Sequence, residues 1–240
     1  MDEMALGLRD VLGRSTRHLQ MISENLANSS TPGFRAGEVM TEPVMPFDRM
    51  LESKIAAHRE RDATDLTQGA LRKTDRPLDF ALSGDGFFVV SHGDKEYLTR
   101  NGSFEVDQER FLRTAAGYHV LDAEGEPLRI PPDTRLEDVH AAEDGRLFVD
   151  GRAFGRFRLE RVNHETDLQR VGTTLFQADP GRRASAENTT VLGRTLESSN
   201  TVVFQELSNL IMLNRSVEAM QRAQGNEMQA QRKMMDALAG

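Results

Sequence analysis

The sequence predicts an α+β fold in which long N- and C-terminal helices pack as a coiled-coil-like pair, with a mostly antiparallel β domain inserted between them. Residues 4–28 and 203–238 both carry apolar side chains at helical spacing. The middle of the chain instead holds apolar runs of four to six residues separated by Gly, Asp, Asn and Pro, a pattern typical of short strands and turns. We therefore expect the N-terminal helix and turn of an axial helical domain at 1–35, a linker at 36–64, a β-rich domain at 65–198 and the C-terminal helix of the axial domain at 199–240.

The first helix is expected to run from Asp2 to Ala27 or Asn28. Its apolar stripe consists of Met4, Leu8, Val11, Leu12, Leu19, Ile22 and Leu26. The cap and turn formers of residues 28–31 end it, and Pro32 reinforces that end because the residue before a proline avoids the α region. A helix of about 26 residues spans roughly 39 Å.

The linker at 36–64 is the most ambiguous part of the chain. Pro43 and Pro46 interrupt its beginning. Residues 47–61 place Met50, Leu51 and Ile55 on one side, so a short helix is an alternative to a loop that orders only on assembly.

The β-rich domain is predicted from apolar runs such as 87–90, 147–149 and 157–162, which are bounded by turn residues. Strands with turn signals at this spacing indicate a compact, mostly antiparallel domain. Asp144-Gly145 and Asp150-Gly151 have the composition of hairpin turns.

The last helix is expected to start near Val202, with Asn200 or Thr201 as its cap. About 36 residues span roughly 54 Å, longer than a usual globular helix, which suggests a coiled-coil partner. Steps of four and three residues give a seam in which four of the eleven positions are amides. The seam positions are Val203, Leu207, Leu210, Asn214, Val217, Gln221, Gln224, Met228, Gln231, Met235 and Leu238. Polar seam residues lower stability but can fix register, and the alternative is a segment that is solvated or frayed in a free monomer.

Composition argues against several classes of protein. The formal charge is −8, and no five consecutive residues carry like charges, so neither nucleic acid nor an anionic membrane surface is an expected partner. Cysteine is absent, which excludes disulfides, Cys-ligated zinc and thiol catalysis. Trp is absent and Tyr occurs twice, so we expect no large aromatic ligand pocket.

No membrane or signal segment is expected. No stretch of 18 apolar residues occurs, so no membrane insertion is predicted. The first twenty residues are charged and amphipathic and lack the apolar core of a signal peptide, so export without a cleaved signal peptide is the expectation.

No catalytic residue, cofactor site or metal site is predicted. The glycines of residues 84–86 precede a strand, whereas a phosphate loop leads into a helix N-terminus. The six histidines are scattered, and His164-Glu165 lacks the second His of a zinc protease helix. A glycosidase pair of carboxylates is the remaining enzyme alternative, although no Asp or Glu stands in a recognisable catalytic setting.

Four sequence blocks resemble one family. Residues 21–28 (MISENLAN) and 31–35 (TPGFR) resemble the N-terminal signature of bacterial flagellar rod and hook proteins, with Glu24 in place of the usual Asn. Residues 67–90 are similar to the start of the β domain of that family, and residues 97–104 (YLTRNGSF) to its hairpin with one residue inserted. Residues 196–200 (LESSN) are similar to the start of its terminal helix. The blocks stand in the order of the family and cover nearly the whole chain.

The resemblance implies a structural subunit of the basal-body rod that polymerises through its terminal helices and transmits torque across the periplasm. The proximal-rod type is preferred, the distal-rod type is the alternative, and a non-flagellar coiled-coil adaptor is a third reading. The implied partners are other copies of the chain, other flagellar rod proteins and the flagellar type III export apparatus. The implied location is the periplasmic rod of the basal body.

Residues on the terminal helices and their flanks are the predicted assembly interface. They are Leu8, Val11, Leu19, Ile22, Asn25, Leu26, Asn28, Phe34, Asn200, Leu207, Leu210, Asn214, Val217, Met228 and Met235. Asn25 and Asn28 either hydrogen-bond neighbouring subunits or simply end the helix while Phe34 fills a core. We also expect the terminal helices to be largely unfolded in the free monomer.

Overall fold

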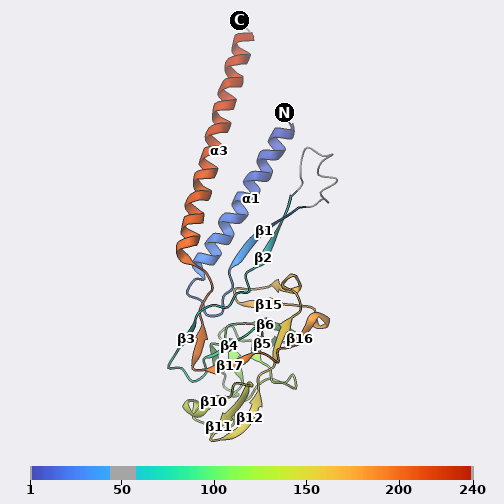
Figure 1. The fold of residues 1–240 in the computed structure, drawn as a ribbon, viewed down its shortest axis with the longest axis vertical. Coiled ribbons are helices and arrows are strands. Elements are labelled where there is room, and N and C mark those ends of the chain that lie inside the picture. Colours follow the sequence, from blue (N-terminus) through green and yellow to red (C-terminus); the bar gives the residue numbers. More distant parts are fainter. Residues whose placement is uncertain (1, 44–57, 239–240) are drawn as a thin grey trace. The chain divides into compact units, whose positions relative to one another are not determined.

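The computed structural model describes residues 2–43 and 58–238. The chain divides into two compact units (Figure 1). The helical unit contains α1 (Asp2–Ala27) and α3 (Val203–Leu238). The β-rich unit spans Asn28–Thr201.

The β-rich unit is built from short strands joined by tight turns, as the sequence predicts. Its strands are β1 (Gly37–Pro43), β2 (His58–Thr64), β3 (Leu71–Lys73), β4 (Phe80–Ser83), β5 (Phe87–His92), β6 (Lys95–Thr99), β7 (Phe104–Val106), β8 (Leu112–Thr114), β9 (His119–Val120), β10 (Val139–Ala141), β11 (Arg146–Val149), β12 (Arg152–Arg156), β13 (Leu159–Val162), β14 (Gln169–Arg170), β15 (Leu175–Gln177), β16 (Arg183–Ser185), β17 (Thr190–Gly193) and β18 (Thr195–Glu197). Three 3₁₀ turns interrupt them at Leu136–Asp138, Glu165–Asp167 and Pro180–Arg182.

The main sheet has the strand order β14-β15-β6-β5-β9-β8-β7, and every described pairing in it is antiparallel. β5 is its centre, because it pairs with β6 along one edge and with both β9 and β13 along the other. Smaller ladders join β10-β11-β12, β17-β4 and β18-β3. The predicted hairpin turn Asp150-Gly151 is confirmed, because it connects β11 to β12 with φ values of 48° and 75°, as a type I′ turn requires.

Hydrophobic cores cover both faces of β5. Successive side chains of a strand point to opposite faces. Phe88 and Val90 therefore enter one cluster, in which the ring centroids of Phe88 and Phe157 are 5.1 Å apart. Phe87 and Val89 enter the other cluster. Burial on both faces explains why residues 87–90 are a continuous apolar run.

The predicted linker contains a pair of strands. β1 pairs antiparallel with β2, from Gly37 opposite Thr64 to Pro43 opposite His58. The short helix considered over residues 47–61 falls mostly outside the described residues, and residues 58–61 of that range lie in β2 instead.

The prediction that the terminal helices pack as a coiled-coil-like pair is wrong, although the α+β composition is compatible with the structure. Asn25 Nδ2 of α1 donates to Glu206 Oε1 of α3 at 2.7 Å. No α3 residue whose side chain is described is buried, and five apolar side chains near its start are 41–82% exposed, including the seam positions Val203 and Leu207. These side chains are Val203, Phe204, Leu207, Ile211 and Met212. The physical reason is that the amides along the seam interrupt the apolar stripe that a second helix would cover. Neither described helix combines the length and the apolar character needed to cross a membrane.

Candidate functional site

The candidate site is a buried junction within the β-rich unit. We define it as residues 31–36, 65–71, 97–102 and 195–200, which overlap the four sequence blocks described above and extend one or two residues beyond three of them. The first segment lies where the chain enters the unit, and the last lies where the chain leaves it. The junction therefore brings together points that are far apart in the sequence.

Glu197 is the centre of the junction. Its carboxylate contacts Arg35 Nη1 at 2.5 Å and Arg100 Nη1 at 3.5 Å, and accepts a hydrogen bond from Gly69 N at 2.8 Å. Its backbone carbonyl accepts from Gly33 N at 2.8 Å. The side chains of Glu197 and Arg35 are fully buried, and that of Arg100 is 3% exposed. One residue of the last segment thus holds groups from the three other segments.

Among the buried side chains of the junction, positive charge exceeds negative charge. Two guanidinium groups share the single buried carboxylate of Glu197. Burial lowers the pKa of Arg100 to about 10, and repulsion from Arg35 adds to this effect, while attraction to Glu197 and Asp85 opposes it. Arg100 remains charged at neutral pH, so Glu197 is needed as its counter-charge. Arg100 Nη2 also donates to Gly84 O at 2.5 Å.

Asn200 binds the entering segment three residues after Glu197. Its Oδ1 accepts from Ala36 N at 2.7 Å, and its Nδ2 donates to Asp65 O at 2.9 Å and Thr67 O at 3.1 Å. Its backbone N–H donates to Phe34 O at 3.4 Å. The amide of Asn200 therefore uses both its acceptor and its donor to join its own segment to two others, at residue 36 and at residues 65–67.

Arg170 covers the outer side of the entering segment. Its guanidinium lies over the rings of Phe34 and Phe176, at 5.1 and 5.0 Å from their centroids. Its Nη2 donates to Arg35 O at 2.6 Å and to Thr64 Oγ1 at 3.4 Å. This one side chain joins the entering segment, the end of β2 and the β14-β15 hairpin.

Two glycines allow the segments to approach closely. Gly33 has φ of +67°, and a Cβ at this position would lie 2.3 Å from Asn101 N. A Cβ on Gly69 would lie 2.0 Å from Ser198 O. Any larger residue at either position would force the segments apart.

The structure places the predicted interface residues as follows. Phe34, Ile22 and Asn25 are buried, at 4%, 9% and 2% exposure. Asn28 accepts a hydrogen bond from Thr31 Oγ1 at 3.2 Å in the turn after α1, as expected for a helix end. Partly exposed are Leu19, Leu26, Asn28, Asn200, Leu210 and Val217; exposed are Leu207 and Asn214; outside the described side chains are Leu8, Val11, Met228 and Met235. Their role in assembly stays a prediction.

Sequence reasoning missed the residues that hold the junction together. Glu197, Arg35 and Arg100 stand inside the quoted blocks, and a charged residue in each block was the available signal. Arg170 stands in no block, and nothing in the sequence marks it.

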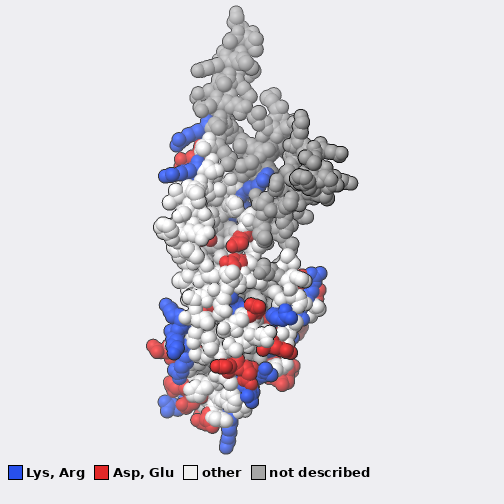
Figure 2. All heavy atoms as spheres, viewed as in Figure 1, with Lys and Arg blue, Asp and Glu red and all other residues white. Residues whose placement is uncertain are grey.

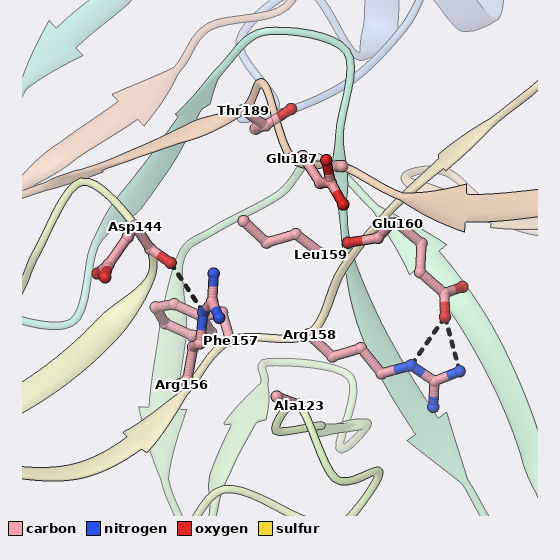
Figure 3. A pocket seen from close by; sticks show the side chains of 11 residues that line it. Ala123, Asp144, Arg156, Phe157, Arg158, Leu159, Glu160, Glu187 and Thr189 are labelled. Atoms are coloured by element: carbon pink, nitrogen blue, oxygen red, sulfur yellow. Dashed lines mark hydrogen bonds and ion pairs between the residues drawn. The ribbon is translucent and has the colours of Figure 1, made fainter.

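A surface cavity of about 360 Å³ lies elsewhere in the β-rich unit (Figure 3). Arg158 Nε donates to Glu160 Oε1 at 2.8 Å, and Arg156 Nε donates to the carbonyl oxygen of Asp144 at 3.0 Å. Burial would lower the pKa of Arg158, but its ion pairs with Glu160 and Glu96 raise it instead. These charged groups are engaged in ion pairs and hydrogen bonds, which suits a structural role better than acid–base chemistry.

The described residues on the face shown in Figure 2 carry no sign of a polyanion partner. On the face shown in Figure 2, Lys and Arg side chains are interspersed with Asp and Glu over the β-rich unit, and no continuous basic stripe is visible there. Among the described residues, no group of three or more His, Asp or Glu is arranged to hold a metal ion.

Comparison with known proteins gives a consistent result. Residues 81–149 match a family model described as the flagellar hook protein FlgE/F/G D1 domain. The chain is 30% identical to the flagellar basal-body rod protein FlgF of Salmonella typhimurium, over 82% of each chain. It is 29% identical to FlgF of Rhizobium meliloti, over 84% of this chain and 83% of the relative. It is 27% identical to the flagellar basal-body rod protein FlgG of Bacillus subtilis, over 84% of this chain and 86% of the relative.

Proposed function

The chain belongs to the flagellar basal-body rod protein family, and from this premise we propose that it is a structural subunit of the rod of the FlgF type. The observation that carries the proposal is the 30% identity to a FlgF protein over 82% of each chain. The chain is a building block of the basal body, assembles with other rod components and is not an enzyme. The adaptor reading is excluded, because the relatives of nearly the whole chain are rod proteins.

Three finer statements belong to the proposal. The position is in the proximal rod, supported by FlgF relatives that include those of Rhizobium meliloti and Caulobacter vibrioides. The chain reaches the periplasm through the flagellar type III export apparatus. Its subunits make head-to-tail contacts that do not close into a ring, since such contacts generate a helical tube.

The junction supports this role physically. A subunit that carries torque must not let its two helical ends shift against each other under load. In the β-rich unit, the entering and leaving segments are joined by Glu197 and Asn200 through buried or partly buried contacts. The exposed apolar side chains of α3 give neighbouring subunits a surface to cover.

A deletion in the source bacterium, followed by electron microscopy of isolated basal bodies, tests the proposal. We expect loss of the rod with the membrane ring left in place, and recovery on complementation with the wild-type gene. A truncated rod that stops short of the outer rings would indicate the distal position instead. Normal rods, hooks and swimming would overturn the proposed function.

Export is tested separately. In a strain that lacks the flagellar export gate, we expect the chain to accumulate inside the cell. Unchanged appearance of the chain in the periplasm would contradict this part of the proposal.

A further inference from the structure

The β18-β3 ladder buries no apolar face of its own, although β17 (Thr190–Gly193), which a single residue separates from β18, is held against β4 by the buried Val191. In the described structure β18 pairs with β3 over three residues, with Glu197 opposite Leu71, Leu196 opposite Arg72 and Thr195 opposite Lys73. All three β3 residues are exposed. Register is strongly specified where a buried apolar face would be turned outward by a slip, and this short ladder offers no such face.

The inward side of β18 is polar. Thr195 and Glu197 are buried, whereas Leu196 between them is partly exposed. The backbone hydrogen bond from Gly33 N to Glu197 O adds no discrimination, because every residue offers a carbonyl oxygen. Within this ladder, a side chain is therefore needed to distinguish one register from another.

Glu197 is the side chain that can supply it. A slip of one residue would turn Glu197 to the opposite face. A slip of two residues would keep the facing but move the strand by about 7 Å and bring Thr195 or Ser199 to the guanidinium groups. In either case Arg35 and Arg100 would stay buried without their carboxylate, which is strongly unfavourable.

We propose that Glu197 is a positioning residue that locks the register of β18. A fixed register also fixes the offset between the segment by which the chain enters the β-rich unit and the segment by which it leaves. Replacing a buried ion pair by apolar residues is often neutral for stability, and a single buried polar group can specify register. The cluster therefore serves to select one arrangement. Its consequence for the rod rests on the proposed function: every copy presents its two helical ends with the same offset.

Disulfide trapping in the full-length chain tests this directly, because the chain contains no cysteine that could interfere. The pair Arg72→Cys with Leu196→Cys reports the native register, since these residues are directly opposite. The pair Arg72→Cys with Ser198→Cys reports a slip of two residues. With the cluster intact, we expect the pair that reports the native register to oxidise at least about a hundredfold faster than the pair that reports the slip, given the cost of an uncompensated buried charge.

The decisive background replaces the whole cluster with Arg35→Met, Arg100→Met and Glu197→Leu. We expect the far-ultraviolet circular dichroism of this variant to match the wild type, while the preference for the native pair falls below about tenfold, since apolar groups no longer distinguish registers. A folded variant that keeps the full preference would overturn the proposal and leave Asn200, the backbone and the packed strand β17 as the determinants of register.

Two single variants keep the proposal testable if the triple variant does not fold. Glu197→Asp keeps the charge and should retain most of the preference. Glu197→Gln keeps the size and an acceptor for Gly69 N but should lose the preference, and equal behaviour of the two variants would overturn the proposal. The trapping uses purified protein, so a bacterium that builds normal rods without this chain would refute the proposed function and leave the register result standing.

Discussion

Replacement of Arg170 by Ala should destabilise the β-rich unit more than any exposed arginine of the same unit. The guanidinium lies over two aromatic rings, each worth about 0.5–1 kcal/mol at a partly exposed site. The 2.6 Å hydrogen bond to Arg35 O involves a charged donor and is worth about 1.5–3 kcal/mol. Together these contacts predict a loss of roughly 2.5–5 kcal/mol in the free energy of unfolding.

Thermal unfolding followed by circular dichroism measures this loss. For a unit of this size, each kcal/mol lowers Tm by about 2–4 °C, so a decrease of roughly 5–20 °C is expected. Arg161→Ala is the matched control, because Arg161 is exposed on β13 and should change stability by less than about 0.5 kcal/mol.

Arg170→Lys separates geometry from charge. Lysine keeps the positive charge but has no planar group to lie over the rings of Phe34 and Phe176 while it also donates to Arg35 O. We expect it to recover about half of the loss. If Arg170→Ala were no worse than Arg161→Ala, the assignment of Arg170 as the cover of the entering segment would be refuted.

Three further predictions concern other parts of the chain. Gly33→Ala should cost about 1–3 kcal/mol more than Gly93→Ala in chemical denaturation, because both have positive φ but only Gly33 would bring a Cβ against backbone atoms. Equal costs would contradict the close approach. Partial burial tends to raise the pKa of Asp107, but the N–H groups of Phe111 and Glu109 and the nearby His119 hold that pKa below 3.8. Ionised Asp107 therefore stabilises the fold at a pH above its pKa in the unfolded chain, and this contribution is lost as the pH falls through the lowered pKa of the folded state. Asp107→Asn should make the free energy of unfolding depend less on pH in the acid range. Phe204→Ser should leave the Tm of the β-rich unit unchanged, because Phe204 is 82% exposed, and should abolish swimming in the complementation assay.

Local features of the fold could be predicted from the sequence, because each depends on residues close together in the chain. The apolar run at 87–90 is β5, and Asp150-Gly151 is a hairpin turn. The strand pair β1-β2 could not be predicted in this way, since most of its residues are not apolar and residues 44–57 separate the two strands in the sequence. A strand that forms because of its pairing partner, and not because of its own composition, is hard to predict from the local sequence.

The wrong prediction that the terminal helices pair and the missed junction have the same origin. Helical spacing of apolar residues in α3 indicates a face to be covered, but it does not identify what covers it, and the sequence prediction assigned that role to α1. The four sequence blocks were recognised one by one, but their meeting around Glu197 depends on the topology that brings residue 35 next to residue 197. Long-range pairing of this kind is what a single sequence does not contain.

The energetics of α3 indicate how such a subunit can stay dispersed when alone and be firmly held among several neighbours. Six apolar side chains at positions 202–212 are exposed in the described structure, on average by about half. Covering each would contribute about 1 kcal/mol, or roughly 6 kcal/mol for the face. Association of two molecules costs about 4–15 kcal/mol in lost freedom, so one neighbour covering this face would hold the subunit weakly or not at all. Several neighbours that together cover the face would hold the subunit firmly, because the loss of freedom on association is incurred only once. A rod subunit with these properties is expected to stay dispersed until several neighbours can cover α3 at once. If Glu197 locks β18 as proposed, the offset of its two helical ends is set before that contact is made.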